Sequence, residues 1–551
     1  MVLFSILASL IQLAIMVGIV VLIVRLVSGR SKTSSEGVGV LIRRFFVYTI
    51  MLFMLVLVGI GVAGLIRAAW PGFDELTDSS SQTAISIAFV VVGLPVYSGL
   101  ALFTKRRLGE DPREQRSAGW AFYLTVALIG SLLASMSLID AVLSNLASDG
   151  DIDRTLLIHA VTWTAIWAGH WGVSRRWKPE RNIQAHLLLG SAVGLIWAFA
   201  GAFATIAALL STVYDRLFLV SIVDGGITEL LTPLTVVVVG VPAWWWYWFR
   251  HARQGSRTPW WLAYVLLLGV LGSAVTVIAG AGVMLFGLLD WIIGDPASSA
   301  AAHFTFLPGA ITGMVVGGGM WAYHAEVLGS RDKRERNEVG RVYDHLLSGA
   351  GLVVAASGIT TLIATAIKAA SGVTIVSVDS GSTLAAAITL IVIGTPLWWH
   401  YWSAIQRART KDPVGELRSI TRRIYIVVLF GVAAIVSVIS LIILVFIVFE
   451  DILEGNFGSG TLDSAGVSVA LLLTAGALAW YHLTVFREDR TDFVPESDDA
   501  PGVPVAQDAP AVRAVRHGSL EETLETLAEA GQDRTLVSWY EDGFDVEPLD
   551  E

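Results

Sequence analysis

Long stretches without a charged residue constrain the fold of this chain more than any other feature. Crossing ~30 Å of hydrocarbon takes a helix of about 20 apolar residues. Stretches such as 2–24, 45–65 and 262–288 reach that length with no internal charge. Because 54% of the residues are hydrophobic and only 15% are charged, lipid is the expected solvent for most of the chain. We count thirteen such stretches, and the other ten are 84–103, 118–138, 156–173, 187–210, 230–249, 304–322, 346–367, 384–402, 424–449 and 465–485.

Twelve of these stretches form six pairs, and each pair ends in a similar short phrase. The clearest copies are Gly240-Val241-Pro242-Ala243-Trp244 and Gly394-Thr395-Pro396-Leu397-Trp398, and the marker aromatic recurs at 97, 171, 244, 321, 398 and 480. A period of about 75 residues indicates a repeated supersecondary unit. We therefore expect an N-terminal anchor helix at 1–30, then hairpins at 31–110, 111–182, 183–257, 258–336, 337–412 and 413–487. Whether these hairpins close into a ring or stack as three four-helix units stays open.

The predicted fold class is an all-α, polytopic transmembrane bundle of about 13 membrane helices. Alternate loops carry 28 Lys and Arg residues, and the intervening loops carry only Arg67, Arg154, Arg216 and Lys368. Because basic loops stay on the cytoplasmic side during insertion, we expect an exterior N-terminus and a cytoplasmic C-terminus. The expected location is the cell membrane, most simply a bacterial plasma membrane, with lipids as the immediate partners.

Residues 488–551 form an acidic cytoplasmic tail in this scheme. From Arg487 onward there are 18 acidic and 5 basic residues, a balance of -13, which leaves the rest of the chain near +3 out of a total of -10. The tail is predicted to be largely disordered, with one short helix that begins at a capping box of Ser519 and Glu522. It either docks on the basic loops or a cytoplasmic protein partner, or it remains a solvated tail.

Tryptophan and histidine gather where the hairpins end beside the basic loops. Anchoring in the headgroup layer explains most of the 20 tryptophans. A sharper alternative is an aromatic vestibule on the cytoplasmic side that holds a cationic or apolar ligand. The candidate ligand-binding residues are Trp244, Trp248, Trp321, His324, Trp398, His400, Trp480 and His482.

Several functional classes are disfavoured by what the sequence lacks. No Asp, Glu, Lys or Arg lies in the middle of a predicted span, although ion-coupled carriers keep such charges for function. The chain has no cysteine and no phosphate loop, GxSxG elbow or HExxH motif. We expect neither an enzyme, nor a metal or other cofactor, nor a nucleic-acid partner.

The endings Pro396 to Trp402 and Pro242 to Trp248, followed by arginines, resemble a bacterial membrane family known as domain of unknown function 5671. The resemblance covers roughly residues 40–487 and implies tandem pairs of membrane helices, but no activity and no site residues. Two functions remain from the residues themselves. The first is a repeat-built cavity or permeation route for a neutral or hydrophobic solute, without ion coupling through a buried carboxylate. The alternative is a scaffolding membrane protein that presents basic loops and an acidic tail to cytoplasmic partners.

Overall fold

The described part of the chain separates into two units. The computed structural model describes residues 38–70, 79–177, 183–218, 227–255, 257–294, 296, 298–329, 338–372, 380–492, 535–540 and 543–548. A membrane unit extends to Asp489, and a tail unit begins at Arg490. All described secondary structure of the membrane unit is helical.

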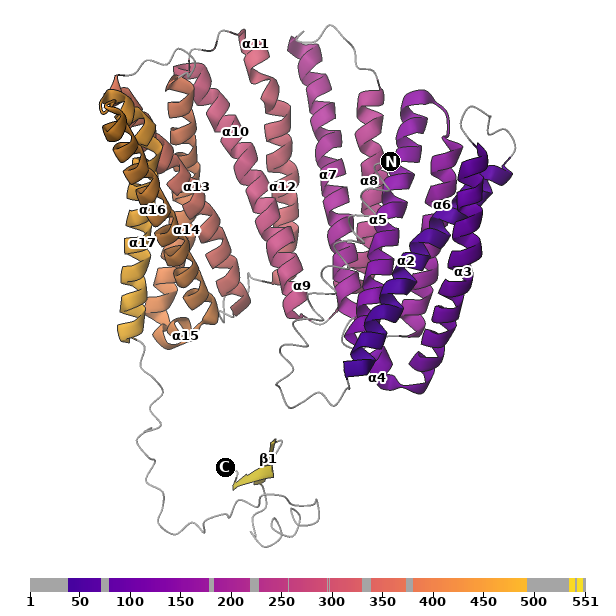
Figure 1. Cartoon of the computed structure of the whole chain (residues 1–551). Helices are drawn as coiled ribbons and strands as arrows, with labels where there is room; N and C mark the ends of the chain where they lie inside the picture. Colours follow the sequence, from indigo (N-terminus) through magenta and orange to yellow (C-terminus); the bar gives the residue numbers. More distant parts are fainter. Residues whose placement is uncertain are drawn as a thin grey trace. The chain divides into compact units, whose positions relative to one another are not determined.

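The membrane unit contains three groups of four long helices (Figure 1). The first group consists of α2 (Val38–Ala69), α3 (Ser79–Glu110), α5 (Ala118–Asp149) and α6 (Arg154–Arg176), with the short α4 (Pro112–Gln115) between its two hairpins. The last group has the same plan, with α13 (Glu338–Ser371), α14 (Ser380–Lys411), α16 (Ile420–Glu454) and α17 (Ser459–Asp492), and the short α15 (Pro413–Arg418).

The central group differs because two of its helices change their winding. Its first hairpin is α7 (Ile183–Phe218) with α8 (Thr228–Trp244), which continues as the π-helix η1 (Trp245–Ala252). Its second hairpin starts with α9 (Pro259–Ala263), the π-helix η2 (Tyr264–Gly272) and α10 (Ser273–Ile293), and returns through α11 (Ala300–His303), η3 (Phe304–Phe306) and α12 (Leu307–Leu328). π-helical turns are rare in proteins overall, and those that do occur are often at functional sites.

Neighbouring groups contact one another along the chain order. Helix α5 of the first group packs on α7 and α8, and α10 of the central group packs on α14. The short helices α4 and α15 lie at the same end of the membrane unit as the start of α9, whereas α11 lies at the other end (Figure 1). We call the end with α4, α9 and α15 the basic end, because the arginine-rich loops are there.

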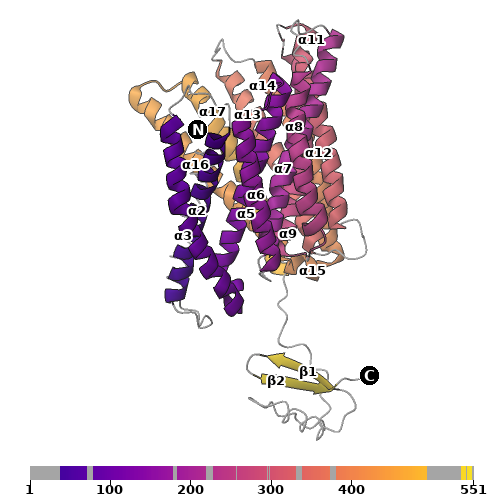
Figure 2. The ribbon, with the colours of Figure 1, turned by 90° about the vertical axis from the view of Figure 1, so that its right-hand side faces the viewer.

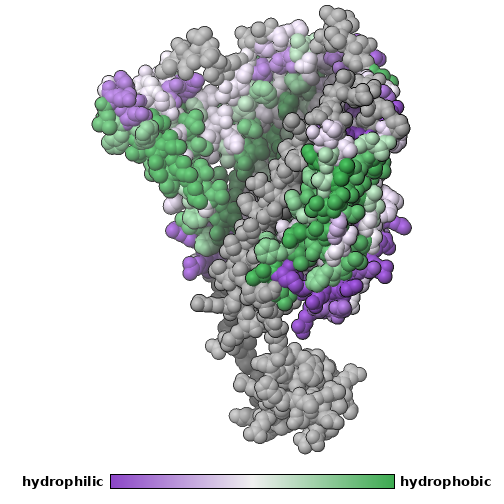
Figure 3. Space-filling model, turned by 45° about the vertical axis from the view of Figure 1, so that its right-hand side comes forward, coloured by the Kyte–Doolittle hydropathy of each residue, from purple (hydrophilic) through white to green (hydrophobic). Residues whose placement is uncertain are grey.

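Eleven of the described helices are long and apolar enough to cross a membrane, judged by length and composition. Helix α6 is 23 residues long but is not among them, since histidine and threonine dilute its apolar residues. The predicted stretch 2–24 lies outside the described residues. On the face that Figure 3 shows, hydrophobic side chains cover the middle of the helices and hydrophilic ones lie toward both ends. The prediction of a multi-pass helical membrane protein is confirmed.

Glycines allow the two helices of a hairpin to approach until their backbones touch. A Cβ atom on Gly240 of α8 would lie 2.5 Å from the backbone nitrogen of Ala198 in α7. On the same pair of helices, a Cβ on Gly201 would lie 2.7 Å from the backbone nitrogen of Val237. Small residues let membrane helices gain van der Waals contact where hydrophobic burial contributes little. The backbones of α16 and α17 do not pack closely in this way.

The tail unit contains a two-stranded antiparallel hairpin, which the sequence reasoning did not predict. Strand β1 (Thr535–Tyr540) pairs with β2 (Gly543–Pro548), and Figure 2 shows the two strands running in opposite directions. In the backbone register, Val537 is paired with Val546 and Trp539 with Phe544. The helix predicted to begin at the capping box lies outside the described residues.

Candidate functional site

Each four-helix group carries the same three side-chain positions near the basic end. An aromatic residue comes from the second helix, a tyrosine from the third and a histidine from the fourth. The tyrosine and histidine rings lie 5.9, 6.1 and 6.3 Å apart in the first, central and last groups. We call these positions the triad, and its members are Tyr97, Tyr123 and His170; Trp244, Tyr264 and His324; and Trp398, Tyr425 and His482.

Helix capping fixes the depth of the triad tyrosine. The third long helical segment of each group starts at an N-cap hydroxyl that accepts a hydrogen bond from the backbone N–H three residues later. The triad tyrosine then follows the cap by six residues in every group. The caps are Ser117, Thr258 and Ser419.

The triad histidines also share one local geometry. In each, Nδ1 lies 2.8 to 3.0 Å from the backbone carbonyl oxygen four residues earlier. A carbonyl oxygen can only accept, so Nδ1 carries the hydrogen, and Nε2 of the neutral ring is an acceptor. The difference between the groups therefore lies in what Nε2 meets.

In the first group, Nε2 of the histidine finds its hydrogen-bond partners within the triad. Nε2 of His170 lies 3.0 Å from the hydroxyl of Tyr123 and 3.4 Å from that of Tyr97. The two hydroxyls are 3.0 Å from each other. The three side chains form a closed hydrogen-bonded cluster that joins α3, α5 and α6, which is a structural role.

The central group satisfies only part of its triad. The indole N–H of Trp244 donates to the hydroxyl of Tyr264 at 3.0 Å. His324 is fully buried, and its Nε2 has no hydrogen-bond partner among the described residues. Gly269 of η2 makes room for this ring, because a Cβ there would collide with it.

The last group leaves its triad open. The hydroxyl of Tyr425 lies 3.0 Å from the Ser348 hydroxyl on α13 and does not bond Nε2 of the histidine, unlike its counterpart in the first group. His482 is 1% exposed, and neither its Nε2 nor the indole N–H of Trp398 has a hydrogen-bond partner within the described ranges. Leaving a buried polar group without a hydrogen bond costs about 1–3 kcal/mol of folding free energy. Each of these two atoms therefore lowers stability as long as it has no partner.

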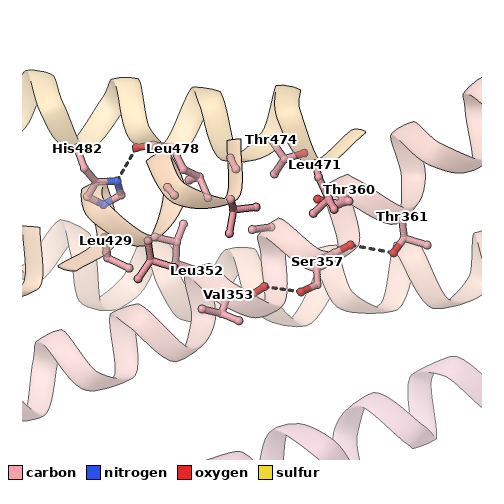
Figure 4. Close-up of a pocket in the computed structure, with 15 residues that line it drawn as sticks. Leu352, Val353, Ser357, Thr360, Thr361, Leu429, Leu471, Thr474, Leu478 and His482 are labelled. Carbon is pink, nitrogen blue, oxygen red and sulfur yellow. Dashed lines mark hydrogen bonds between the residues drawn. The ribbon is translucent and has the colours of Figure 1, made fainter. Parts of the chain in front are cut away.

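His482 lines a cavity of about 370 Å³ between α13, α16 and α17. In Figure 4, His482 lies beside Leu478 and Leu429, while Thr474 and Thr360 lie toward the other end. The walls between are mostly aliphatic. Thr474 is 8% exposed, and its hydroxyl is a second buried polar atom without a partner in the described part of the chain. The cavity is therefore largely apolar, and the two unpaired polar atoms are buried in its walls.

A buried Arg–Glu pair sits at the basic end of the first and last groups. Arg44 of α2 donates to Glu114 of α4 at 3.0 Å, and Tyr48 donates to the same carboxylate at 2.7 Å. In the last group, Arg341 of α13 donates to Glu416 of α15 at 2.9 Å. Both glutamates follow an Asp-Pro step in which the aspartate caps the short helix. These pairs fix the loop between two hairpins against the first helix of the group.

The electrostatics of Glu114 follow from these contacts. Burial alone would raise the pKa of its carboxyl group. Hydrogen bonds from Tyr48 and Arg44, together with the charges of Arg44 and Arg43, outweigh burial and hold the pKa below its ordinary value of 4.5. Glu114 is therefore ionised at neutral pH.

The structure separates the candidate vestibule residues into different surroundings. Trp244 and Trp248 lie within 6.3 Å of His324, measured between ring centroids. Trp402 accompanies His482 instead, at 6.1 Å. Trp321 packs against the cluster that contains Trp248 and donates to Tyr343, and Trp398 packs beside Trp402 and edge-on to Trp399. The His400 ring packs on Tyr401, and Trp480 is 68% exposed. Their ligand-binding role stays a prediction.

Sequence reasoning missed the triad tyrosines and the buried Arg–Glu pairs. A signal for the tyrosines was present, since Ser or Thr is followed six residues later by Tyr in four places, and three of these are the capped helix starts. The Asp-Pro steps at 111–112 and 412–413, each with a glutamate shortly after, were a second signal. Both signals lie in or near the arginine-rich loops. The charge of these loops predicts the orientation in the membrane, but it does not indicate which side chains their residues contact.

One family model matches the chain in two regions. The family is described as a domain of unknown function, DUF5671, and the matched residues are 44–169 and 341–481. No curated protein and no solved structure matches the chain. Each matched region spans one four-helix group, from the arginine of the Arg–Glu pair to the residue before the triad histidine. The first and last groups of this multi-pass membrane protein thus each match the model of the DUF5671 family, in a repeated arrangement.

Proposed function

We propose that this membrane protein binds a neutral, largely hydrophobic solute in the cavity of its last group. The observation that carries the proposal is the cavity of about 370 Å³ between α13, α16 and α17, whose walls are mostly aliphatic with a few hydroxyl-bearing side chains. Ligand sites are typically apolar pockets with a few polar groups that fix orientation.

The proposal also includes an orientation in the bacterial plasma membrane, with the basic end in the cytoplasm. Arginine retention on the cytoplasmic side supports it. In this orientation His482 lies toward the cytoplasmic end of the cavity and Thr474 lies two helical turns deeper in the bilayer.

Filling the cavity tests the proposal. Ala433 of α16 is 9% exposed and lines the cavity, so Ala433→Phe places a ring inside it. Val438→Phe is the matched control, since Val438 lies on the same helix, is 56% exposed and does not line the cavity. Binding of 1-dodecanol to the purified protein in nanodiscs would be followed by native mass spectrometry. We expect binding by the wild type and the control and loss of binding by Ala433→Phe; equal binding by all three would contradict the proposal.

A further inference from the structure

We propose that the first and last groups of the membrane unit dock head to tail on further copies of this chain. In this contact, α16 of one copy packs against α3 of the next copy. The contact repeats, between two chains, the packing by which consecutive groups are already joined within one chain. It does not depend on the cavity of the last group.

Within the chain, the third long helix of one group packs on the second helix of the next group. Helix α5 packs on α8, and α10 packs on α14. Across the first of these contacts, the hydroxyl of Thr235 on α8 lies 2.6 Å from the carboxyl group of Asp140 and 3.0 Å from the hydroxyl of Ser144 on α5. One turn along α8, Val239 is 8% exposed and belongs to the same core cluster as Met136 of α5.

The second contact uses the same two positions of the receiving helix. Thr235 and Val239 lie five residues and one residue before the glycine of the Gly-x-Pro step in α8, and Thr389 and Ile393 lie at these places in α14. Thr389 is buried. Ile393 is half-buried, and its Cδ1 lies 3.8 Å from a Cβ built on Gly282 of α10. We call these two positions the receiving face of a group.

The receiving face of the first group is uncovered. Its residues on α3 are Ala88 and Val92, again five residues and one residue before the glycine of a Gly-x-Pro step. Ala88 is exposed and Val92 is 59% exposed, although the equivalent residues of α8 and α14 are buried or half-buried. No four-helix group precedes this one in the described part of the chain.

The last group leaves the complementary face uncovered on α16. Asp140 and Ser144 of α5 follow the N-cap serine by 23 and 27 residues, and Ile442 and Phe446 follow the N-cap serine of α16 by the same numbers. Asp140 and Ser144 are half-buried against the next group, whereas Ile442 and Phe446 are 63% and 60% exposed. Because this face and the receiving face of α3 are both exposed, they do not cover each other within one chain.

The two uncovered faces match in chemistry and in direction. Three polar residues meet in the internal contact, and their equivalents at the ends are all apolar: Ile442 and Phe446 on α16 and Ala88 on α3. Exchanging both partners of a buried polar contact for apolar groups leaves no group unpaired. Every group starts at the basic end, so a second copy in the same orientation brings α16 to α3 at the depth where α5 meets α8. Such head-to-tail contacts produce a closed ring or an open row.

Paired cysteines test the contact, because the chain has no cysteine of its own. Chains with Ala88→Cys and chains with Ile442→Cys carry different affinity tags, are co-expressed and are oxidised in the membrane with copper phenanthroline. We expect disulfide-linked dimers that contain both tags. The matched internal pair, Asp140→Cys with Thr235→Cys in one chain, should close within that chain. Ile87→Cys in place of Ala88→Cys is the control, since the preceding residue points about 100° away on the helix and should give no linked dimer.

Each other outcome contradicts the proposal. If the internal pair closes and no dimer with both tags forms, lipid covers the two faces. Dimers with only one kind of tag would indicate a symmetric contact instead. Linkage of Ala88→Cys or Ile442→Cys to Ala14→Cys of the same chain would assign the face to the stretch 2–24. A second measurement needs no substitution: native mass spectrometry of the wild type in lipid particles cut directly from the membrane should show more than one copy, and single copies alone would overturn the proposal.

Discussion

Replacing Gly240 with alanine should force α7 and α8 apart. The new Cβ would lie 2.5 Å from the backbone nitrogen of Ala198, 2.7 Å from the carbonyl carbon of Trp197 and 2.9 Å from the Ala198 Cα. Ordinary contact begins near 3.4 Å. All three atoms belong to a helix backbone, so no side-chain rotation can relieve the overlap. The helices must separate by about 0.9 Å, the difference between 3.4 and 2.5 Å.

Two opposing effects set the size of the change. Overpacking in a well-packed interior typically costs 1–3 kcal/mol. Alanine is a better helix former than glycine by roughly 0.5–1 kcal/mol, which offsets part of that cost. We expect a net decrease of about 1–2 kcal/mol in the free energy of unfolding.

Two other glycines provide matched controls. Gly130 of α5 has no atom within 4 Å of an added Cβ, so Gly130→Ala should leave stability unchanged or raise it. Gly93 precedes a proline at the same repeat position as Gly240, but its nearest neighbour is a methyl group of Val58 at 3.1 Å, so Gly93→Ala should have a smaller effect. Unfolding with SDS in mixed micelles, followed by circular dichroism, measures all three. If Gly240→Ala is as stable as Gly130→Ala, the close approach of α7 and α8 is wrong.

Three further predictions concern the ends of the helices. Because the pKa of Glu114 is lowered in the folded state, its ionised form stabilises the fold above pH 4.5. This stabilisation is lost as the pH falls through the folded-state pKa. Glu114→Gln should therefore make the melting temperature depend less on pH in the acid range. Because the chain has no native cysteine, single thiols at Asp149 and Arg334 can be labelled without background. An impermeant reagent added outside cells should label Asp149→Cys but not Arg334→Cys, and labelling of both would overturn the orientation. Truncation after Arg490 retains Asp489, which pairs with Arg422 at 2.6 Å, so melting and elution of the membrane unit should not change; a loss of assembly would contradict this.

Much of the fold could be predicted because lipid imposes strict rules. Backbone groups in hydrocarbon must pair within the segment, so apolar length alone predicts helices such as α2 and α16. Helix α6 shows the limit of composition, since His159 and His170 make it less apolar than its 23-residue length would suggest. The hairpin in the tail was missed because six-residue alternating segments with few contacts give a weak signal beside an acidic, proline-rich stretch.

The candidate site was harder to predict, since it depends on the hydrogen-bond partners of single atoms. The sequence places His170, His324 and His482 at similar repeat positions, and nothing local distinguishes them. The distinction arises from residues distant in sequence: Tyr123 bonds the first histidine, whereas the hydroxyl of Tyr425 lies within bonding distance of Ser348. Competition for one hydroxyl depends on tertiary contacts, and the periodicity of the sequence does not predict these.

The two states of the triad have a consequence for how duplicated membrane domains diverge. In the first copy, His170 links three helices through its bonds to Tyr97 and Tyr123, so its substitution is expected to loosen the scaffold. In the second copy, the hydroxyl of the neighbouring tyrosine lies within bonding distance of Ser348, and the equivalent histidine does not link the helices in this way. The bonding partner of one tyrosine hydroxyl thus differs between the two copies, and the surroundings of the histidine differ with it, although both histidines keep the same local geometry on their own helices.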